Sequence, residues 1–229
     1  MKTAIVTGAF GNMGQAVVKK FINEGYKVIG TIIPNEAIPV DFPGDKFEKM
    51  VVDLMNEDDS AKFVADIISK YGSVDAAILT VGGFAMGSMG DTKTSDITTQ
   101  YKLNFETAYN AARPIFVQML KQNKGRIFLI GSKAGLDAKS GKGMVAYGLG
   151  KSLIFRLAEL MNEEAKGTDV VTSVVVPGTI DTPQNRKAIT DADPAKWVKP
   201  DAIADVIYFY CTDEAAVLRE PLLKVYNNS

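Results

Sequence analysis

T-A-I-V-T-G-A-F-G-N-M-G, residues 3–14, is the stretch that decides the fold. Its first five residues form a short, largely β-branched and apolar run, typical of a strand buried on both faces. Gly8, Gly11 and Gly14 follow, and apolar residues then recur at helical spacing. A helix N-terminus presents free backbone N–H groups, and glycine lets them approach a pyrophosphate closely. A tight strand-to-helix turn without a ligand is the alternative, but the position between a strand and a helix favours a dinucleotide site.

Strand and helix patterns alternate along the rest of the chain. Apolar runs predict strands at 3–7, 27–33, 47–54, 74–81, 125–131, 170–176 and 222–226. Helical spacing predicts helices after the glycine turn and at 57–71, 95–122, 146–166 and 200–211, with Pro114 as a kink. Residues 34–44, 84–93 and 179–199 are expected to be loops. This order predicts an α/β fold: a single doubly wound parallel sheet (Rossmann-like) with helices on both faces, in one domain spanning 1–229.

The composition excludes several kinds of site. The chain has 229 residues, a net charge of −1, no histidine and one cysteine, Cys211. This small net charge, without a basic cluster, does not indicate binding to nucleic acid or to an anionic membrane. Without histidine there is no serine–histidine triad or zinc–histidine site, and one cysteine makes neither a disulfide framework nor a thiolate metal cage. Because a strand already begins near Met1 and no apolar run could span a bilayer, we expect a cytoplasmic protein.

The carboxyl ends of the expected strands carry small or polar residues. They are Gly8, Ile32, Asp53, Gly82, Ser132 and Gly178. Ligands of open α/β sheets bind at that edge, where glycines leave room for them. This convergence supports a ligand site more strongly than the glycine turn alone.

Acid–base chemistry is expected at Ser132, Tyr147 and Lys151. Tyrosine and lysine four residues apart share one helix face, so the ammonium can lie near the phenol oxygen. A neighbouring cation, or an oxidised nicotinamide ring, lowers the pKa of a phenol from its usual value of about 10. Tyr147 could then exchange a proton with an alcohol or carbonyl oxygen, and Ser132 could donate a hydrogen bond to the same oxygen. An ordinary surface pair and a turn serine are the alternatives, and the position at the ligand edge favours catalysis.

Asn104 is a fourth candidate. It lies on an otherwise core-facing stripe of Ile97, Tyr101, Asn104, Ala108, Ala111 and Ile115. A buried carboxamide needs partners, which a bound water or a backbone group in the site would supply. An asparagine satisfied within its own helix is an equally good interpretation of this residue alone.

Taken together, these motifs resemble the short-chain dehydrogenase/reductase family over nearly the whole chain. The resemblance identifies Asn104, Ser132, Tyr147 and Lys151 with the catalytic tetrad, in which Tyr147 is the general acid and Asn104 anchors a water that relays protons to Lys151. It implies the cofactor-binding residues Gly8, Phe10, Gly11, Asn12, Met13, Gly14, Ile32, Asp53, Leu54, Val81, Gly82, Gly83, Tyr147, Lys151, Pro177, Gly178, Ile180 and Thr182. Two features depart from the family: T-V-G-G at 80–83 replaces N-x-A-G, and the loop between Ser132 and Tyr147 is slightly long.

A narrower resemblance concerns the second half of the chain. V-G-G-F at 81–84, S-K-A-G-L-D at 132–137, G-M-V-A-Y-G-L-G-K at 143–151 and D-T-P-Q-N-R-K at 181–187 resemble the quinoid dihydropteridine reductase branch. The animal enzymes of that branch lack the tetrad serine and asparagine, which this chain has. The resemblance implies hydride transfer from a reduced nicotinamide to a small carbonyl or pteridine-like substrate. A non-catalytic dinucleotide sensor is the rival hypothesis, although such proteins typically lose the tyrosine or lysine.

The cofactor is expected to be NADP(H), with NAD(H) as a close alternative. The second strand ends T-I-I-P at 31–34 without the carboxylate that would repel a 2′-phosphate, and Glu36 lies beyond Pro34. No arginine or lysine stands in the glycine turn to attract that phosphate, and the pteridine-reductase resemblance implies NADH. The preference is therefore expected to be weak.

The helix at 146–166 indicates self-association. Its apolar residues lie on more than one side: Leu149, Leu153, Leu157 and Leu160, but also Ile154, Ala158 and Met161. A helix that is apolar over most of its surface is buried over most of it. In the family that this chain resembles, this helix and the preceding long one pack against a second subunit, which implies a homodimer or homotetramer.

Overall fold

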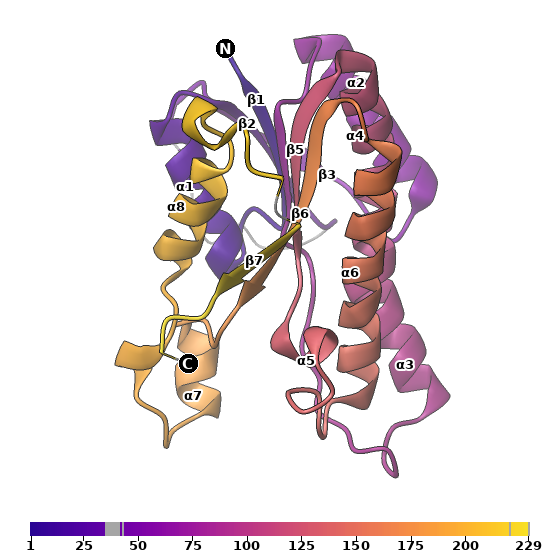
Figure 1. Cartoon of the computed structure of the whole chain (residues 1–229), viewed down its shortest axis with the longest axis vertical. Coiled ribbons are helices and arrows are strands. Elements are labelled where there is room, and N and C mark those ends of the chain that lie inside the picture. Colours follow the sequence, from indigo (N-terminus) through magenta and orange to yellow (C-terminus); the bar gives the residue numbers. More distant parts are fainter. Residues whose placement is uncertain (35–41, 43, 220, 229) are drawn as a thin grey trace.

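The computed structural model describes residues 1–34, 42, 44–219 and 221–228. Its centre is one sheet of seven parallel strands in the order β3-β2-β1-β4-β5-β6-β7 (Figure 1). The strands are β1 (Thr3–Thr7), β2 (Lys27–Ile32), β3 (Phe47–Val51), β4 (Ala76–Leu79), β5 (Lys124–Ile130), β6 (Asp169–Pro177) and β7 (Leu222–Val225). The parallel α/β sheet predicted from the sequence is confirmed, with strand ends shifted by up to three residues.

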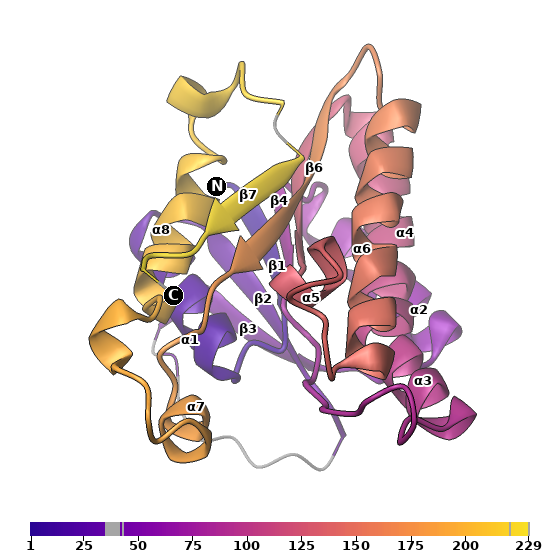
Figure 2. The ribbon, with the colours of Figure 1, turned by 60° about the horizontal axis from the view of Figure 1, so that its bottom comes forward.

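Helices cover both faces of the sheet (Figures 1 and 2). One layer holds α1 (Asn12–Asn23) and α8 (Pro200–Phe209), and the other holds α2 (Glu57–Tyr71), α4 (Thr107–Gln122) and α6 (Val145–Glu164). In β1, Ala4 and Val6 belong to the core under the first layer, whereas Ile5 belongs to the core under the second. The strand is therefore buried on both faces along its whole length. None of the helices in the described part of the chain combines the length and apolarity that crossing a membrane requires.

The prediction of one continuous helix at 95–122 is wrong. The structure has α3 (Thr94–Tyr101), a π-helical segment Lys102–Glu106, and then α4. Pro114 lies inside α4, and the π-helical segment surrounds Asn104. π-Helical turns are frequent at functional sites. The predicted core-facing stripe is also wrong at one position, because Tyr101 is exposed.

Two predicted loops contain helices. Residues 179–199 hold α7 (Pro183–Ala188) and a 3-10 turn, Pro194–Lys196, and α5 (Lys133–Leu136) follows β5. In α7, Thr182 is the N-cap and Pro183 occupies the first turn, a start signal readable in the sequence. Most of the predicted loop at 34–44 lies outside the described residues.

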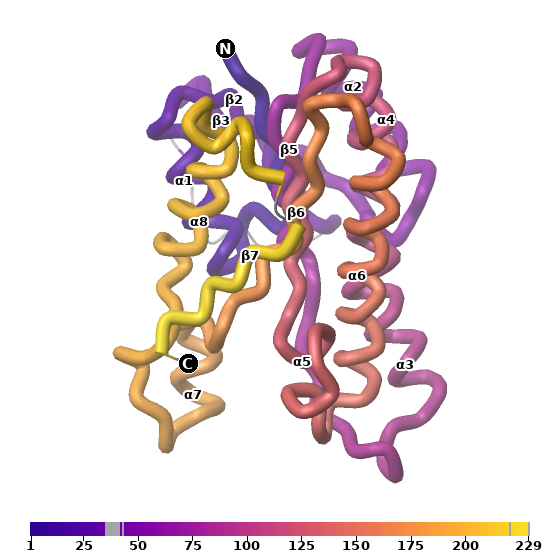
Figure 3. The backbone as a smooth tube through the Cα atoms, in the orientation of Figure 1, coloured from indigo at the N-terminus to yellow at the C-terminus, as the bar shows by residue number. Residues whose placement is uncertain are grey.

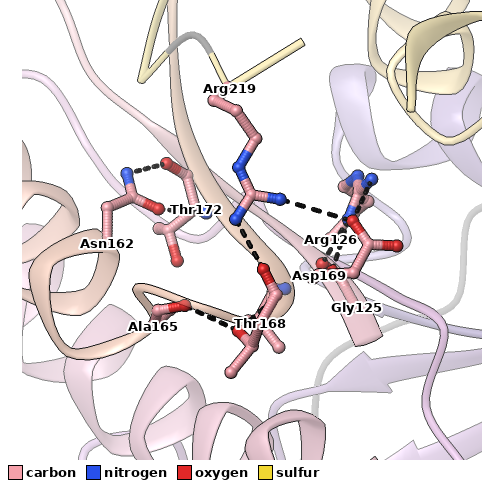
Figure 4. Close-up of polar contacts among 9 residues, drawn as sticks. Gly125, Arg126, Asn162, Ala165, Thr168, Asp169, Thr172 and Arg219 are labelled. Atoms are coloured by element: carbon pink, nitrogen blue, oxygen red, sulfur yellow. Dashed lines mark hydrogen bonds and ion pairs between the residues drawn. The ribbon is translucent and has the colours of Figure 1, made fainter. Parts of the chain in front are cut away.

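The amino edge of the sheet is held by charged side chains (Figure 4). Arg126 of β5 donates to the Asp169 carboxylate at 2.9 Å and to the Asp169 carbonyl at 2.7 Å, which ties β5 to β6. Arg219 reaches the same carboxylate at 3.4 Å and donates to the Thr168 carbonyl at 2.7 Å. These contacts lie at the end of the sheet opposite to the candidate site.

Candidate functional site

The glycine turn after β1 has the close backbone geometry that the sequence predicts. Gly8 has φ +61°, a left-handed conformation that favours glycine. A Cβ atom on Gly14 would lie 2.1 Å from the Gly8 carbonyl oxygen, so only glycine fits there. Helix α1 begins directly afterwards, and its N-cap, Gly11, makes no side-chain capping hydrogen bond. The first N–H groups of α1 therefore remain able to bind an anion.

A hollow of about 530 Å³ lies beside this turn, where the order of the strands reverses between β1 and β4. Thirteen predicted cofactor residues line it: Gly8, Phe10, Gly11, Asn12, Met13, Gly14, Ile32, Asp53, Leu54, Val81, Gly82, Ile180 and Thr182. Sequence reasoning missed Thr31, Ile33, Met55, Thr80, Leu103 and Thr107 in its wall. The predicted residues Gly83, Tyr147, Lys151, Pro177 and Gly178 are not part of this lining.

The hollow has little side-chain charge, so a ligand in it would be bound mainly by backbone groups and apolar side chains. Asp53 is the one charged residue among those described in its lining, and it accepts a hydrogen bond from the Met55 N–H at 2.9 Å. Ile33 and Met55, both exposed, give apolar surface beside it. A flat base fits apolar walls and a phosphate fits the start of α1. The hollow thus matches the chemistry of a dinucleotide.

Ser132, Tyr147 and Lys151 meet beyond the end of β5. Ser132 caps α5 and accepts a hydrogen bond from the Gly135 N–H at 3.2 Å. The Tyr147 side chain, in the first turn of α6, is hydrogen-bonded to Ser132. Lys151, one turn later, is buried and donates to the Ile130 carbonyl at 2.8 Å. Three side chains predicted to act together are therefore positioned by α5, α6 and the last residue of β5.

Burial controls the protonation of this group. It raises the pKa of the Tyr147 phenol above its usual value, and the hydrogen bond with Ser132 opposes that rise. Burial also lowers the pKa of the Lys151 ammonium to about 8. The net pKa of Tyr147 in the chain alone is therefore raised and not lowered as expected, because desolvation is the largest effect. The second expected source, an oxidised nicotinamide ring, would come from the cofactor.

Asn104 connects the π-helical segment to the end of β4. Its Nδ2 donates to the Gly83 carbonyl at 3.0 Å and to Gln100 Oε1 at 2.9 Å, and its Oδ1 accepts from the Gly83 N–H at 3.1 Å. A Cβ atom on Gly82 would lie 2.7 Å from Asn104 Oδ1 and 3.1 Å from Lys151 Nζ. The backbone at Gly82 therefore lies against both side chains where the hollow ends. Asn104 finds the backbone partner that its burial requires.

Helix α7 reaches across to the glycine turn. Gln184 accepts a hydrogen bond from Asn12 Nδ2 at 2.9 Å, although the two residues are 172 positions apart. Thr182 caps α7 by accepting from the Asn185 N–H at 3.1 Å. In the backbone tube of Figure 3, α7 and α5 lie at the same end of the molecule, beyond the strands. Residues 184–197 are expected from the sequence to line the substrate pocket, but nothing local in the sequence indicates the contact of Gln184 with Asn12.

Comparison with known proteins is consistent with this geometry. The family model described as short chain dehydrogenase matches residues 2–193. The chain is 24% identical over 229 residues to the 3-oxoacyl-(acyl-carrier-protein) reductase FabG of Thermotoga maritima, covering 94% of this chain and 92% of that protein. It is 26% identical over 189 residues to the acetoacetyl-CoA reductase of an Acinetobacter species, covering 80% and 75%.

Solved structures share the fold. The aldohexose dehydrogenase of Thermoplasma acidophilum superposes with a TM-score of 0.84 at 23% identity, covering 99% of this chain and 93% of that one. ElxO with NADP bound superposes with a TM-score of 0.88 at 20% identity, covering 99% and 97%.

Proposed function

The chain belongs to the short chain dehydrogenase family and is an NAD(P)-dependent oxidoreductase, and on this premise we propose that it reduces small carbonyl compounds with Tyr147 as the proton donor. One observation carries the proposal. The Tyr147 side chain is hydrogen-bonded to Ser132 beside the buried Lys151, and Lys151 lies against the backbone at Gly82 where the hollow ends.

Each residue of the group has a role in this proposal. When bound, the nicotinamide cofactor supplies the hydride. Tyr147 gives its proton to the oxygen of the substrate, and the high pKa that burial imposes keeps the phenol protonated until then. Ser132 orients that oxygen through a second hydrogen bond. Lys151 provides positive charge that stabilises the phenolate formed. Asn104 fixes Gly83 and, we propose, holds a water that relays protons to Lys151.

The turn at Gly8, Gly11 and Gly14 would hold the pyrophosphate, Asp53 and Leu54 the adenine, and the run 177–182 the nicotinamide carboxamide. The preference proposed is for NADP(H), by less than about tenfold or ~1.4 kcal/mol. No carboxylate follows β2 at Ile33 to repel a 2′-phosphate, and no lysine or arginine occurs in the described lining to attract it. Two structural neighbours, serine dehydrogenase and ElxO, are described with NADP. A ratio of kcat/KM favouring NADH by roughly a hundredfold would contradict this preference.

A pteridine is the second candidate substrate. The observation that favours it is the similarity of 81–84, 132–137, 143–151 and 181–187 to the dihydropteridine reductase branch. The relatives named above are instead a 3-oxoacyl-(acyl-carrier-protein) reductase and an acetoacetyl-CoA reductase. A ketone and a quinonoid dihydropterin differ in which atom receives the proton, so both belong in the assay.

We also propose that the chain assembles at least into a homodimer through α4 and α6. On α6, Leu149, Leu153 and Leu160 are 51%, 38% and 56% exposed. On the neighbouring helix, Tyr109 and Val117 are exposed as well. Figures 1 and 2 both show the two helices side by side on the outside of the second layer. Leucines left in water on such a face indicate a protein interface.

The experiment follows the loss of reduced nicotinamide absorbance in the purified protein. NADH and NADPH are each tested against quinonoid dihydropterin and a panel of ketones and α-diketones. Turnover of any carbonyl supports the proposal. Tight cofactor binding without turnover of any substrate would contradict it and favour the rival, a dinucleotide sensor on the same fold.

A further inference from the structure

An exposed phenylalanine lies beside the proposed proton donor. Phe84 is 63% exposed, yet its ring contacts the Tyr147 ring edge-to-face, with centroids 5.2 Å apart and planes at 73°. Phe84 is not among the residues that line the dinucleotide hollow. A large apolar side chain left in water next to a catalytic group needs an explanation, because burying it would be favourable.

The backbone on both sides of Phe84 is held in place. Gly83 makes two hydrogen bonds with the side chain of Asn104, and a Cβ atom at Gly83 would lie only 2.5 Å from Leu103 Cδ2. On the other side, the Gly87 N–H donates to the Gly143 carbonyl at 2.8 Å, and the Gly87 carbonyl accepts from the Val145 N–H at 3.0 Å. The segment 83–87 is therefore tied to the π-helical segment at one end and to the start of α6 at the other.

The same segment presents further apolar surface. Met86 and Met89 are 68% and 79% exposed. The Cε atom of Met86 would lie 3.9 Å from a Cβ atom on Gly143, which places Met86 beside the loop that leads into α6. Methionine adapts its shape to apolar ligands of different outline, whereas a fixed phenylalanine ring selects flat ones.

We propose that Phe84 is a specificity-determining residue that selects carbonyl substrates bearing an aromatic ring next to the reacting carbon. The inference rests on the proposed function, because it takes Tyr147 as the group that binds the carbonyl oxygen. With the oxygen at Tyr147, the substituent on the carbonyl carbon lies within reach of the Phe84 ring. A ring–ring contact there favours an aryl substituent over an alkyl one by up to about tenfold in kcat/KM.

The test compares 1-phenyl-1,2-propanedione with 2,3-hexanedione in wild type, Phe84→Leu and Phe84→Ala. Wild type should prefer the aryl diketone by roughly five- to tenfold. Both variants should lose that preference, mainly through a higher KM for the aryl substrate, while kcat with the alkyl substrate and cofactor affinity stay near wild type. Phe209→Ala is the matched control, since Phe209 is also exposed and makes an edge-to-face contact with a tyrosine, Tyr210, at the end of α8.

Two outcomes overturn the inference while leaving the proposed function intact. One is a wild type that turns over both diketones equally well or prefers the alkyl one. The other is a Phe84 variant whose kcat falls equally with both substrates, because that pattern shows a residue that only supports Tyr147. If the wild type turns over neither these diketones nor any other carbonyl, the proposed function fails and the inference fails with it.

Discussion

Gly82 is the residue where the dinucleotide hollow meets the catalytic side chains. A methyl group there would lie 2.7 Å from Asn104 Oδ1 and 3.1 Å from Lys151 Nζ, both inside ordinary contact distance. Gly82→Ala must therefore displace Asn104, Lys151 or the backbone. Displacements of about 1 Å near reacting groups can cost roughly a hundredfold in rate. We expect kcat to fall by about ten- to a hundredfold, measured by steady-state turnover of the best substrate found.

Gly90→Ala is the matched control for this change. The nearest atom to a Cβ at Gly90 is Ser88 Oγ at 3.9 Å, which is an ordinary contact. Its activity should stay within about twofold of wild type, because surface substitutions without a structural role change little. Equal activities of the two alanine variants would show that Gly82 does not lie where the structure has it.

Lys151 makes stability depend on pH. Burial lowers its pKa from 10.5 to about 8 in the folded protein. Between about pH 8 and 10.5 the unfolded chain holds this proton and the folded chain has lost it, so the free energy of unfolding rises with pH in that window. Below pH 8 both states are charged and the cost of burying the ammonium is fully present. A shift of this size is worth about 3 kcal/mol.

Urea unfolding of wild type and Lys151→Met at pH 7, 8, 9 and 10 measures this contribution. The wild type should gain stability relative to Lys151→Met as the pH rises, by a total of about 2–3 kcal/mol. Lys62→Met, which changes a lysine with an 80% exposed side chain, is the control and should follow the wild-type pH dependence. A constant difference between wild type and Lys151→Met across this range would contradict the burial of a charged Lys151.

Helices α4 and α6 expose apolar side chains that contacts within a single chain do not explain. Leu153 lies in the middle of the exposed apolar face of α6. Leu153→Glu would bury a carboxylate in the proposed interface, which is strongly unfavourable. Light scattering at micromolar concentration should give at least twice 24.7 kDa for wild type and a shift toward 24.7 kDa for the variant. Val217→Glu, at a site that is 84% exposed outside these helices, should behave as wild type. A monomeric wild type would refute the assembly.

The sequence predicts elements whose pattern is local. Most strands are rich in apolar residues, and α2 has its predicted bounds, 57–71, with Asn56 as N-cap. The π-helical segment was not predictable in this way, because it accompanies contacts of Asn104 with Gly83, 21 residues away. Pro114, where a local rule predicts a kink, lies inside α4, which continues on both sides of it. Helix α7 was missed although Thr182-Pro183 carries a start signal, because the polar residues around it resemble a loop.

Across the whole molecule, the amino and carboxyl edges of the sheet differ in the side chains that they carry. The amino edge is closed by ion pairs such as Arg126 with Asp169, whereas the carboxyl edge keeps glycines, a hollow and exposed apolar side chains. Strand order explains why: the chain segments that follow the neighbouring strands β1 and β4 leave toward opposite faces of the sheet, and the hollow lies between them. The sequence predicts which residues lie at the carboxyl edge, because each of them stands at or directly after the end of a predicted strand. Phe84 and Gln184 fall in segments expected to line the substrate pocket, but their contacts with Tyr147 and Asn12 join parts of the chain that are far apart in the sequence.

The central claim is that Tyr147 donates the proton at this edge. Tyr147→Phe removes the phenol hydroxyl and keeps the ring that packs on Phe84. Tyr210→Phe, the same chemical change away from the site, is the control.

The deciding measurement is the single-turnover rate of reduced cofactor oxidation with the best carbonyl substrate, together with cofactor affinity by fluorescence titration. We expect Tyr147→Phe to lower the rate by ~10²–10⁴ with cofactor affinity nearly unchanged, and Tyr210→Phe to keep both the rate and the affinity. A Tyr147→Phe protein that retains more than about half of the wild-type rate would contradict it, because general acid catalysis contributes at least ~10².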